Sequence, residues 1–209
     1  MAKSSRSKQT KNIWQKLLVF VLIFALYFAL DYFGIISSSD EPEEQPVAEA
    51  TVEQQESNLP FVEDPFEADG SLKESVRYKT GEYDYYYETD EEGRIVLFET
   101  DELQLTTRDE RLPHDGNTPG KIKGDHAGHL AGDRFGGSPH IDNLVSQSSK
   151  VNLSTYKKME NAWASALEEG KDVTVEVDVI YTDDDMRPDE FDVEYTIDGE
   201  YFTQHLLNQ

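Results

Sequence analysis

The segment 124–160 gathers residue types that could activate water and hold a hard cation. It contains two neighbouring histidines, His126 and His129, several glycines, and Asn152 close to the start of a predicted helix. A histidine can take a proton from water near neutral pH, because its ordinary pKa is about 6.5. Mg²⁺ accepts few protein ligands and keeps several waters, so one oxygen donor such as Asn152 can suffice to bind it. A base and a hard cation are together what hydrolysis of a phosphodiester needs.

A second oxygen donor, Glu160, lies eight residues after Asn152, which is about two helical turns. Both residues can therefore present oxygens near one side of the first turns of a helix. A histidine on a strand facing that helix would complete a site with a base and a metal ligand. The ordinary interpretation of an isolated asparagine here is a residue that starts a helix. We interpret the remaining histidines as satisfied polar residues: His114, His126, His140 and His205.

The same segment carries a series of short motifs in a fixed order. They are AGHL at 127–130, DRFGG at 133–137, DNLV at 142–145 followed by Gln147, then Asn152, and a helix with Glu160, Asn161 and Trp163. In these motifs the chain resembles the DNA/RNA non-specific endonucleases, a family of ββα-metal (His-Me finger) nucleases that includes membrane-anchored and secreted bacterial enzymes. The resemblance continues weakly through 83–94 and 187–199, and so covers most of residues 80–200.

The resemblance implies a role for each matched residue. His129 would be the general base, and Asn143 would orient His129 and its loop. Asn152 would bind Mg²⁺ directly, with Mn²⁺ as an alternative metal. Glu160 would hold water in the outer shell of that metal.

The chain departs from the D-R-G-H form of the family motif at one position. Ala127 stands two residues before the base, where that form has an arginine. The family uses arginines to stabilise the pentacovalent phosphate, and Arg134 is the nearest replacement for the missing one. Four further basic residues near the site could bind backbone phosphates: Arg108, Arg111, Lys150 and Lys157. For the two lysines, the alternative is an ordinary surface helix face.

Hydrophobic periodicity predicts the elements that must position these residues. A helix is expected over 154–169, with Ser154 as its cap and Gly170 at its end, because apolar residues recur at helical spacing. Strands are expected where side chains alternate, at 83–88, 94–105, 173–181 and 191–197, with a tight turn at 198–199. The apolar parity of the second strand includes Ile95, Leu97, Leu103 and Leu105. The sequence thus predicts an α+β fold, a ββα-metal nuclease core with an antiparallel sheet and one long helix.

The N-terminal part has a different composition. Its first residues are basic and an apolar run follows, which predicts a short cytoplasmic tail at 1–12 and a transmembrane signal-anchor helix at 13–36. An acidic flexible tether at 37–75 would connect this anchor to a nuclease domain at 76–209. The C-terminal domain would then lie outside the cell on a single-pass membrane protein. The alternative is a cleaved signal peptide and a secreted protein.

Charge and cysteine content limit the function classes. The chain has 43 acidic and 19 basic residues, for a formal charge of -24, which by itself argues against a polyanion as substrate. There is no cysteine, which excludes disulfide partners, thiolate catalysis and cysteine-ligated metals.

These observations together predict an extracellular metal-dependent endonuclease that acts on the phosphate backbone of DNA and also of RNA. Two alternatives stay open. The first is a non-catalytic acidic surface module on a nuclease-like fold, which the negative charge and the missing arginine favour. The second is a toxin nuclease paired with an immunity protein, which the predicted anchor disfavours.

Overall fold

A computed structural model describes residues 57–83 and 85–209 of the chain. The predicted cytoplasmic tail at 1–12 and membrane anchor at 13–36 lie outside these residues, as does the part of the predicted tether at 37–56. Within the described ranges, no helix is long and apolar enough to cross a bilayer.

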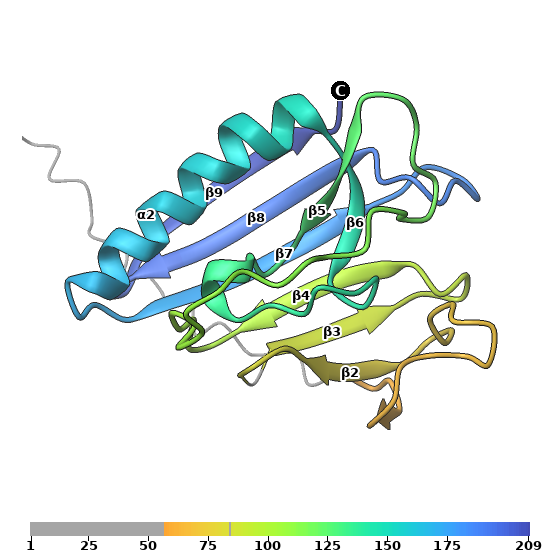
Figure 1. The fold of residues 1–209 in the computed structure, drawn as a ribbon, viewed down its shortest axis with the longest axis horizontal. Helices are drawn as coiled ribbons and strands as arrows, with labels where there is room; N and C mark the ends of the chain where they lie inside the picture. The colour runs from red at the N-terminus through yellow and green to blue at the C-terminus, as the bar shows by residue number, and fades with distance from the viewer. Residues whose placement is uncertain (1–56, 84) are drawn as a thin grey trace, which may run out of the picture. The chain divides into compact units, whose positions relative to one another are not determined.

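Seven strands form one sheet in the order β1-β2-β3-β4-β7-β8-β9. Their bounds are β1 Phe61–Val62, β2 Arg77–Thr80, β3 Tyr85–Thr89, β4 Ile95–Thr100, β7 Val173–Ile180, β8 Glu190–Ile197 and β9 Glu200–Leu207. Strand β1 runs parallel to β2, and all other neighbours in this sheet are antiparallel. Figure 1 shows the helix α2, Lys157–Glu168, lying along the β7–β9 part of the sheet.

A second, two-stranded sheet lies beside α2 and carries the chemistry-bearing segment. It consists of β5, Asp125–His129, and β6, Leu144–Ser148, which pair antiparallel. A short 3₁₀ turn at Asp133–Phe135, η1, lies in the connection between them. A π-helical turn at Val151–Tyr156, η2, then leads from β6 into α2. The order β5, β6, α2 gives the ββα arrangement that the sequence predicts.

The alternation predicted for the C-terminal strands is confirmed. Val173, Val175, Val177 and Val179 are each at most 3% exposed, and β7 pairs with β8 along its whole length. The turn between β8 and β9 uses Asp198 and Gly199 at φ 50° and 80°, the left-handed geometry that suits a two-residue hairpin. The predicted turn and its partner strand are therefore correct.

Three expectations need correction. Phe98, rather than Leu97, points into the core from β4, because the pairing of β3 with β4 shifts register between Glu88 and Thr89. Residues assigned to the tether already contain β1, so folded structure begins before residue 76. Ser154 does not cap the helix. It lies inside η2, and its hydroxyl donates to the carbonyl of Lys150.

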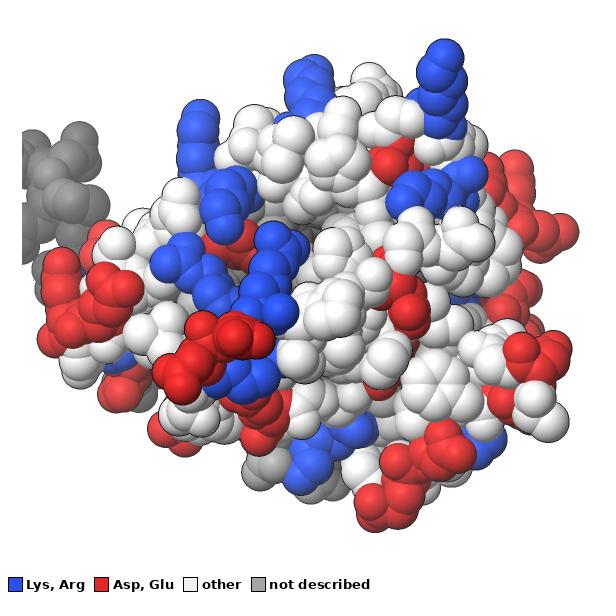
Figure 2. Space-filling view, in the orientation of Figure 1, with Lys and Arg blue, Asp and Glu red and all other residues white. Residues whose placement is uncertain are grey.

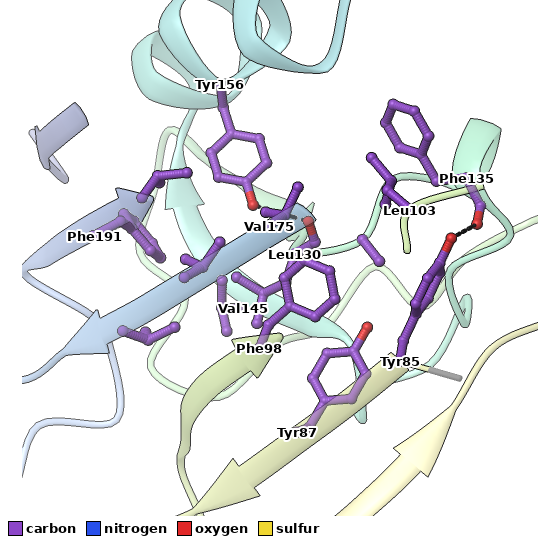
Figure 3. Close-up of a cluster of buried hydrophobic side chains, with 14 of the residues drawn as sticks. Tyr85, Tyr87, Phe98, Leu103, Leu130, Phe135, Val145, Tyr156, Val175 and Phe191 are labelled. Atoms are coloured by element: carbon purple, nitrogen blue, oxygen red, sulfur yellow. Dashed lines mark hydrogen bonds between the residues drawn. The ribbon is translucent and has the colours of Figure 1, made fainter. Parts of the chain in front are cut away.

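Aromatic side chains from the sheet and the helix region form the core (Figure 3). Tyr85 and Tyr87 of β3 each pack against Phe98 of β4. Trp163 of α2 is 1% exposed and its ring centroid lies 5.5 Å from that of Tyr195 on β8, which fixes α2 on the sheet. Trp163 is therefore a core residue, as its helical spacing indicates.

The sheet face opposite α2 is acidic. Register places Glu99, Glu176 and Glu194 side by side on β4, β7 and β8, and Asp178 lies next to Asp192 in the same way. Partial burial and the neighbouring carboxylates raise the pKa of Glu176 and of Asp178. Glu99 is paired with Arg77 of β2, whereas the carboxylates on β7 and β8 face each other as like charges, which destabilise a sheet.

Candidate active site

His129 is the last residue of β5 and is largely buried. Its ring centroid lies 5.0 Å from that of His114, which comes from the loop before β5. Burial, together with the charges of His114 and Arg111, lowers the pKa of His129 to about 4. At neutral pH the imidazole is therefore uncharged, which is the form that can accept a proton.

Asn143 holds the loop that follows His129. Its Oδ1 accepts hydrogen bonds from the backbone N–H of Ala131 (2.9 Å) and the hydroxyl of Tyr87 (2.8 Å). Its Nδ2 donates to the carbonyls of Ala131 (2.9 Å) and Ser138 (2.7 Å). The side chain is fully buried and uses both of its polar atoms, so it fixes the backbone directly after the proposed base.

Leu130, the residue next to His129, is fixed from two further directions. Its N–H donates to the carbonyl of Asn143 at 3.0 Å, and its carbonyl accepts a 2.8 Å hydrogen bond from the hydroxyl of Tyr156. Figure 3 shows the Tyr156 ring reaching from the helix region toward Leu130. The strand end is thereby attached to the element that carries Asn152.

Asn152 lies inside η2 and contacts a histidine other than His129. Its Nδ2 is 3.0 Å from Nδ1 of His126 on β5. No hydrogen bond to its Oδ1 occurs among the described residues, so the oxygen predicted to bind a cation is available. No described contact joins Asn152 directly to His129.

Glu160 lies on the first turn of α2 and packs against the backbone of Gly132, where a side chain would collide with its carboxylate. Burial raises the pKa of Glu160, while the charges of Lys157, Arg134 and Arg111 lower it. Lys157 donates a 3.4 Å hydrogen bond to its Oε2. Arg111 therefore acts electrostatically on both Glu160 and His129.

The three candidate arginines differ in how they are bound. Arg108 forms an ion pair with Glu82 and donates to the carbonyl of Asp133 at 3.2 Å. Arg134 donates a 2.8 Å hydrogen bond to Asn161. Arg111 is exposed and has no hydrogen bond or ion pair within the described part of the chain. Of the three, Arg111 has the guanidinium that is free to meet a ligand.

The residues present fit a cation that keeps most of its water. Across 57–83 and 85–209, no group of three or more acidic or histidine side chains is placed to hold a metal, so a cation here would have few protein ligands, as Mg²⁺ commonly does. Gln147 on β6 lies against Gly128, is fully buried, and has no partner for either amide atom. Buried amides are normally paired, and an ordered water would satisfy this one.

A cavity of about 510 Å³ lies away from these residues. Its lining includes Glu67, Leu72, Glu92, Pro119 and Met186, and none of the predicted site residues. Figure 2 shows that Lys and Arg side chains gather in the upper left part of the face with α2, while acidic side chains lie mainly toward its edges. Lys150 and Lys157 are exposed.

The four histidines interpreted from the sequence as satisfied polar residues each have a neighbour in the structure. His114 packs against His129, and His126 is hydrogen-bonded to Asn152. His140 and His205 are exposed histidines paired with Asp115 and Asp192, as expected. The short spacing between His126 and His129 indicates that both lie on one strand, β5. It does not predict that His126 contacts Asn152, because that contact depends on the tertiary fold.

Known proteins resemble this chain in sequence and in fold. Residues 74–199 match the family model described as DNA/RNA non-specific endonuclease. The chain is 37% identical over 147 residues to the type VII secretion system protein EssD of Staphylococcus aureus strain USA300, a match that covers 66% of this chain and 24% of that protein. The chain thus spans about a quarter of the length of this relative.

A solved structure has the same fold. NucA from Streptococcus agalactiae, with a magnesium ion bound, superposes with a TM-score of 0.50 at 18% identity, over 73% of this chain and 83% of that one. The family model covers more than half of the residues, and the ββα unit lies within the matched range. The chain belongs to the DNA/RNA non-specific endonuclease family.

Proposed function

We propose that this protein is a metal-dependent endonuclease that hydrolyses phosphodiester bonds in DNA and RNA. The observation that carries the proposal is an uncharged, largely buried imidazole, His129, at the end of β5 in a ββα unit. The family match supports the reaction class. The choice of metal and the activity on RNA belong to the proposal.

In the proposed reaction His129 accepts a proton from the water that attacks phosphorus. The low pKa of His129 keeps it in its basic form at neutral pH. Asn143 does not touch substrate. It fixes the backbone at Ala131 and so holds His129 in place, which makes it a positioning residue.

The proposed metal site uses Asn152 and Glu160. Oδ1 of Asn152 would be the direct ligand, and the carboxylate of Glu160 and the unpartnered amide of Gln147 would hold water around the ion. Mg²⁺ bound there, or Mn²⁺ in its place, would neutralise charge on the phosphate and on the leaving oxygen. The bound magnesium ion of NucA supports the choice of Mg²⁺.

Substrate binding is assigned to the phosphate backbone. Arg111, Lys150 and Lys157 are exposed beside the proposed site, and phosphate contacts carry no base information. We assign the stabilisation of the pentacovalent phosphate to Arg111, in place of the predicted Arg134, since Arg134 is engaged with Asn161. Arg108 is assigned a structural role through Glu82.

We further propose that the nuclease domain acts outside the cell. The name of the relative EssD, a secretion system protein, supports export. The membrane anchor at 13–36 remains a sequence-based proposal.

A plasmid assay with the full chain tests the function. Plasmid and structured RNA are each incubated with the protein and Mg²⁺, with Mn²⁺, and with a chelator. We expect both substrates to be cut with either metal and left intact with the chelator. Intact plasmid under every metal condition would reject the nuclease and select the non-catalytic module.

A further inference from the structure

Asn152 can bind a cation only if its side-chain amide has the correct orientation. An asparagine amide can rotate by half a turn about its last bond, which exchanges the oxygen for the nitrogen. Only the oxygen binds a cation, because the NH₂ group is a donor. A site built on one amide oxygen therefore needs a neighbour that selects the orientation of that amide.

We propose that His126 is this neighbour, a positioning residue that holds the amide of Asn152 with its oxygen toward the cation. The inference rests on the proposed function, since it requires Asn152 to be a metal ligand. Nδ1 of His126 lies 3.0 Å from Nδ2 of Asn152. In this contact Nδ1 accepts and the amide donates, so Oδ1 faces away from the histidine and has no other described partner.

The surroundings of His126 support this role. It lies opposite Gln147 across the β5–β6 pair, so both side chains are on the same face of the hairpin, and the Gln147 amide is buried without a partner. Gln147 lies against Gly128, where only a glycine leaves room for it, so a buried amide without a partner lies on the same face of the hairpin as His126. His129 has the other parity on β5 and contacts His114 instead, so the base and the metal ligand each have their own histidine.

The arrangement also fixes the tautomer of His126. A neutral imidazole whose Nδ1 accepts carries its proton on Nε2. The opposite tautomer would donate from Nδ1 to Oδ1 of Asn152 and turn the amide nitrogen toward the cation position. In metal sites, a hydrogen bond from a neighbouring residue commonly fixes the orientation of a metal ligand. Removing such a neighbour weakens metal affinity by roughly 10- to 100-fold.

Metal binding by the full chain in detergent tests the proposal, with free Mn²⁺ counted by electron paramagnetic resonance. His126→Leu removes the acceptor, and we expect Mn²⁺ affinity to fall by roughly 10-fold or more. His126→Asn keeps an uncharged acceptor, its amide oxygen, at the position of Nδ1. We therefore expect the Mn²⁺ affinity to stay within about 3-fold of that of the original protein. His140→Leu removes an exposed histidine outside the site and serves as the control, with no change expected.

A second measurement covers a His126→Leu variant that does not fold. Long-range ¹⁵N spectra of the unsubstituted protein with Mg²⁺ report which nitrogen of His126 carries the proton, and we expect Nε2. A proton on Nδ1, unchanged Mn²⁺ affinity in folded His126→Leu, or failure of His126→Asn to restore affinity would each overturn the proposal. If the unsubstituted protein cuts plasmid and binds Mn²⁺, these results reject His126 alone. If it does neither, the proposed function fails as well.

Discussion

The hydroxyl of Tyr156 donates a 2.8 Å hydrogen bond to the carbonyl of Leu130, the residue that follows His129. Tyr156 is the last residue of the π-helical turn that contains Asn152. One side chain therefore connects the backbone beside the proposed base to the turn that carries the proposed metal ligand. Both atoms are buried, so the distance between the two elements is set in the core rather than at the surface.

Tyr156→Phe tests this connection. The change leaves a buried carbonyl without its donor, so we expect the free energy of unfolding to fall by about 1–3 kcal/mol and the cleavage rate to fall with it. Urea denaturation and plasmid cleavage measure the two effects. Tyr195→Phe is the matched control, because the Tyr195 hydroxyl has no hydrogen bond within the described residues. Equal stability losses in both variants would mean that the Leu130 bond contributes nothing specific.

His129→Ala removes the proposed base. We expect kcat to fall by about 10²- to 10⁴-fold, with an unchanged circular dichroism spectrum and unchanged Mn²⁺ affinity. His140→Ala, at an exposed histidine paired with Asp115, should keep full activity. Cleavage by His129→Ala at the original rate would remove this residue from the mechanism.

The low pKa of His129 predicts how both activity and stability depend on pH. Since its pKa is lowered to about 4, the acid limb of kcat/KM should lie near pH 4 rather than near pH 6.5. In the unfolded chain His129 takes up a proton below about pH 6.5, whereas in the folded protein it does so only near pH 4. Between these two pH values, acid therefore favours the unfolded chain. The contribution of His129 to stability is thus complete above that range and is lost as pH falls through it. In His129→Gln the free energy of unfolding, measured by urea titration, should fall less steeply between pH 7 and pH 4; an equally steep fall would contradict the assignment.

Arg111 and Arg108 should behave differently when each is changed to glutamine. Arg111 is exposed and unpaired among the described residues, so Arg111→Gln should lower kcat/KM by roughly 10-fold or more and reduce the salt dependence of DNA binding by about one phosphate contact. Arg108→Gln breaks the ion pair with Glu82 and should mainly lower thermal stability. Steady-state kinetics at several salt concentrations and a melting curve separate the two. The assignment fails if Arg108→Gln lowers kcat/KM more than Arg111→Gln does.

Relief of like charges on the acidic sheet face should stabilise the protein. Glu176 faces Glu99 and Glu194 on the neighbouring strands, and its raised pKa means that its charged form is disfavoured in the folded state. Glu176→Gln should therefore raise the free energy of unfolding at pH 7 by roughly 0.2–1 kcal/mol, and this gain should shrink as the pH falls and Glu176 becomes protonated. Denaturation at pH 7 and pH 4.5 measures this, and a loss of stability at pH 7 would contradict it.

Sequence reasoning found the parts of the fold that depend on local pattern. The valines of β7 alternate because one face of that strand is buried and the other is exposed, and Gly170 ends α2 at φ 78° because a glycine adopts that conformation without strain. Alternation predicts the wrong face for Leu97, because it does not encode the register shift in the β3–β4 pair. The sequence pattern predicts a helix cap at Ser154, because the π-helical turn before α2 has no periodicity that distinguishes it from a helix start.

The candidate site could be predicted only in part for a similar reason. Motif spacing pointed to His129, Asn143, Asn152 and Glu160, and the structure shows Asn143 holding the loop that follows His129. Two contacts at the site, His126 with Asn152 and His114 with His129, join different elements of the chain. Sequence spacing predicts neither contact. The same holds for the arginines, since the partners of Arg108 and Arg134 become visible only in the folded protein.

The row of carboxylates across β4, β7 and β8 has a consequence for how a long polyanion meets this protein. That face lies on the other side of the sheet from α2, so a DNA strand that approaches it is repelled over the range of the Debye length. On the proposed function, this repulsion would reduce unproductive adsorption and raise the fraction of collisions that begin beside Arg111 and Lys157. The acidity of the chain, which by itself argues against nucleic acid, would then govern the direction of approach and leave binding to a few positive groups on one side.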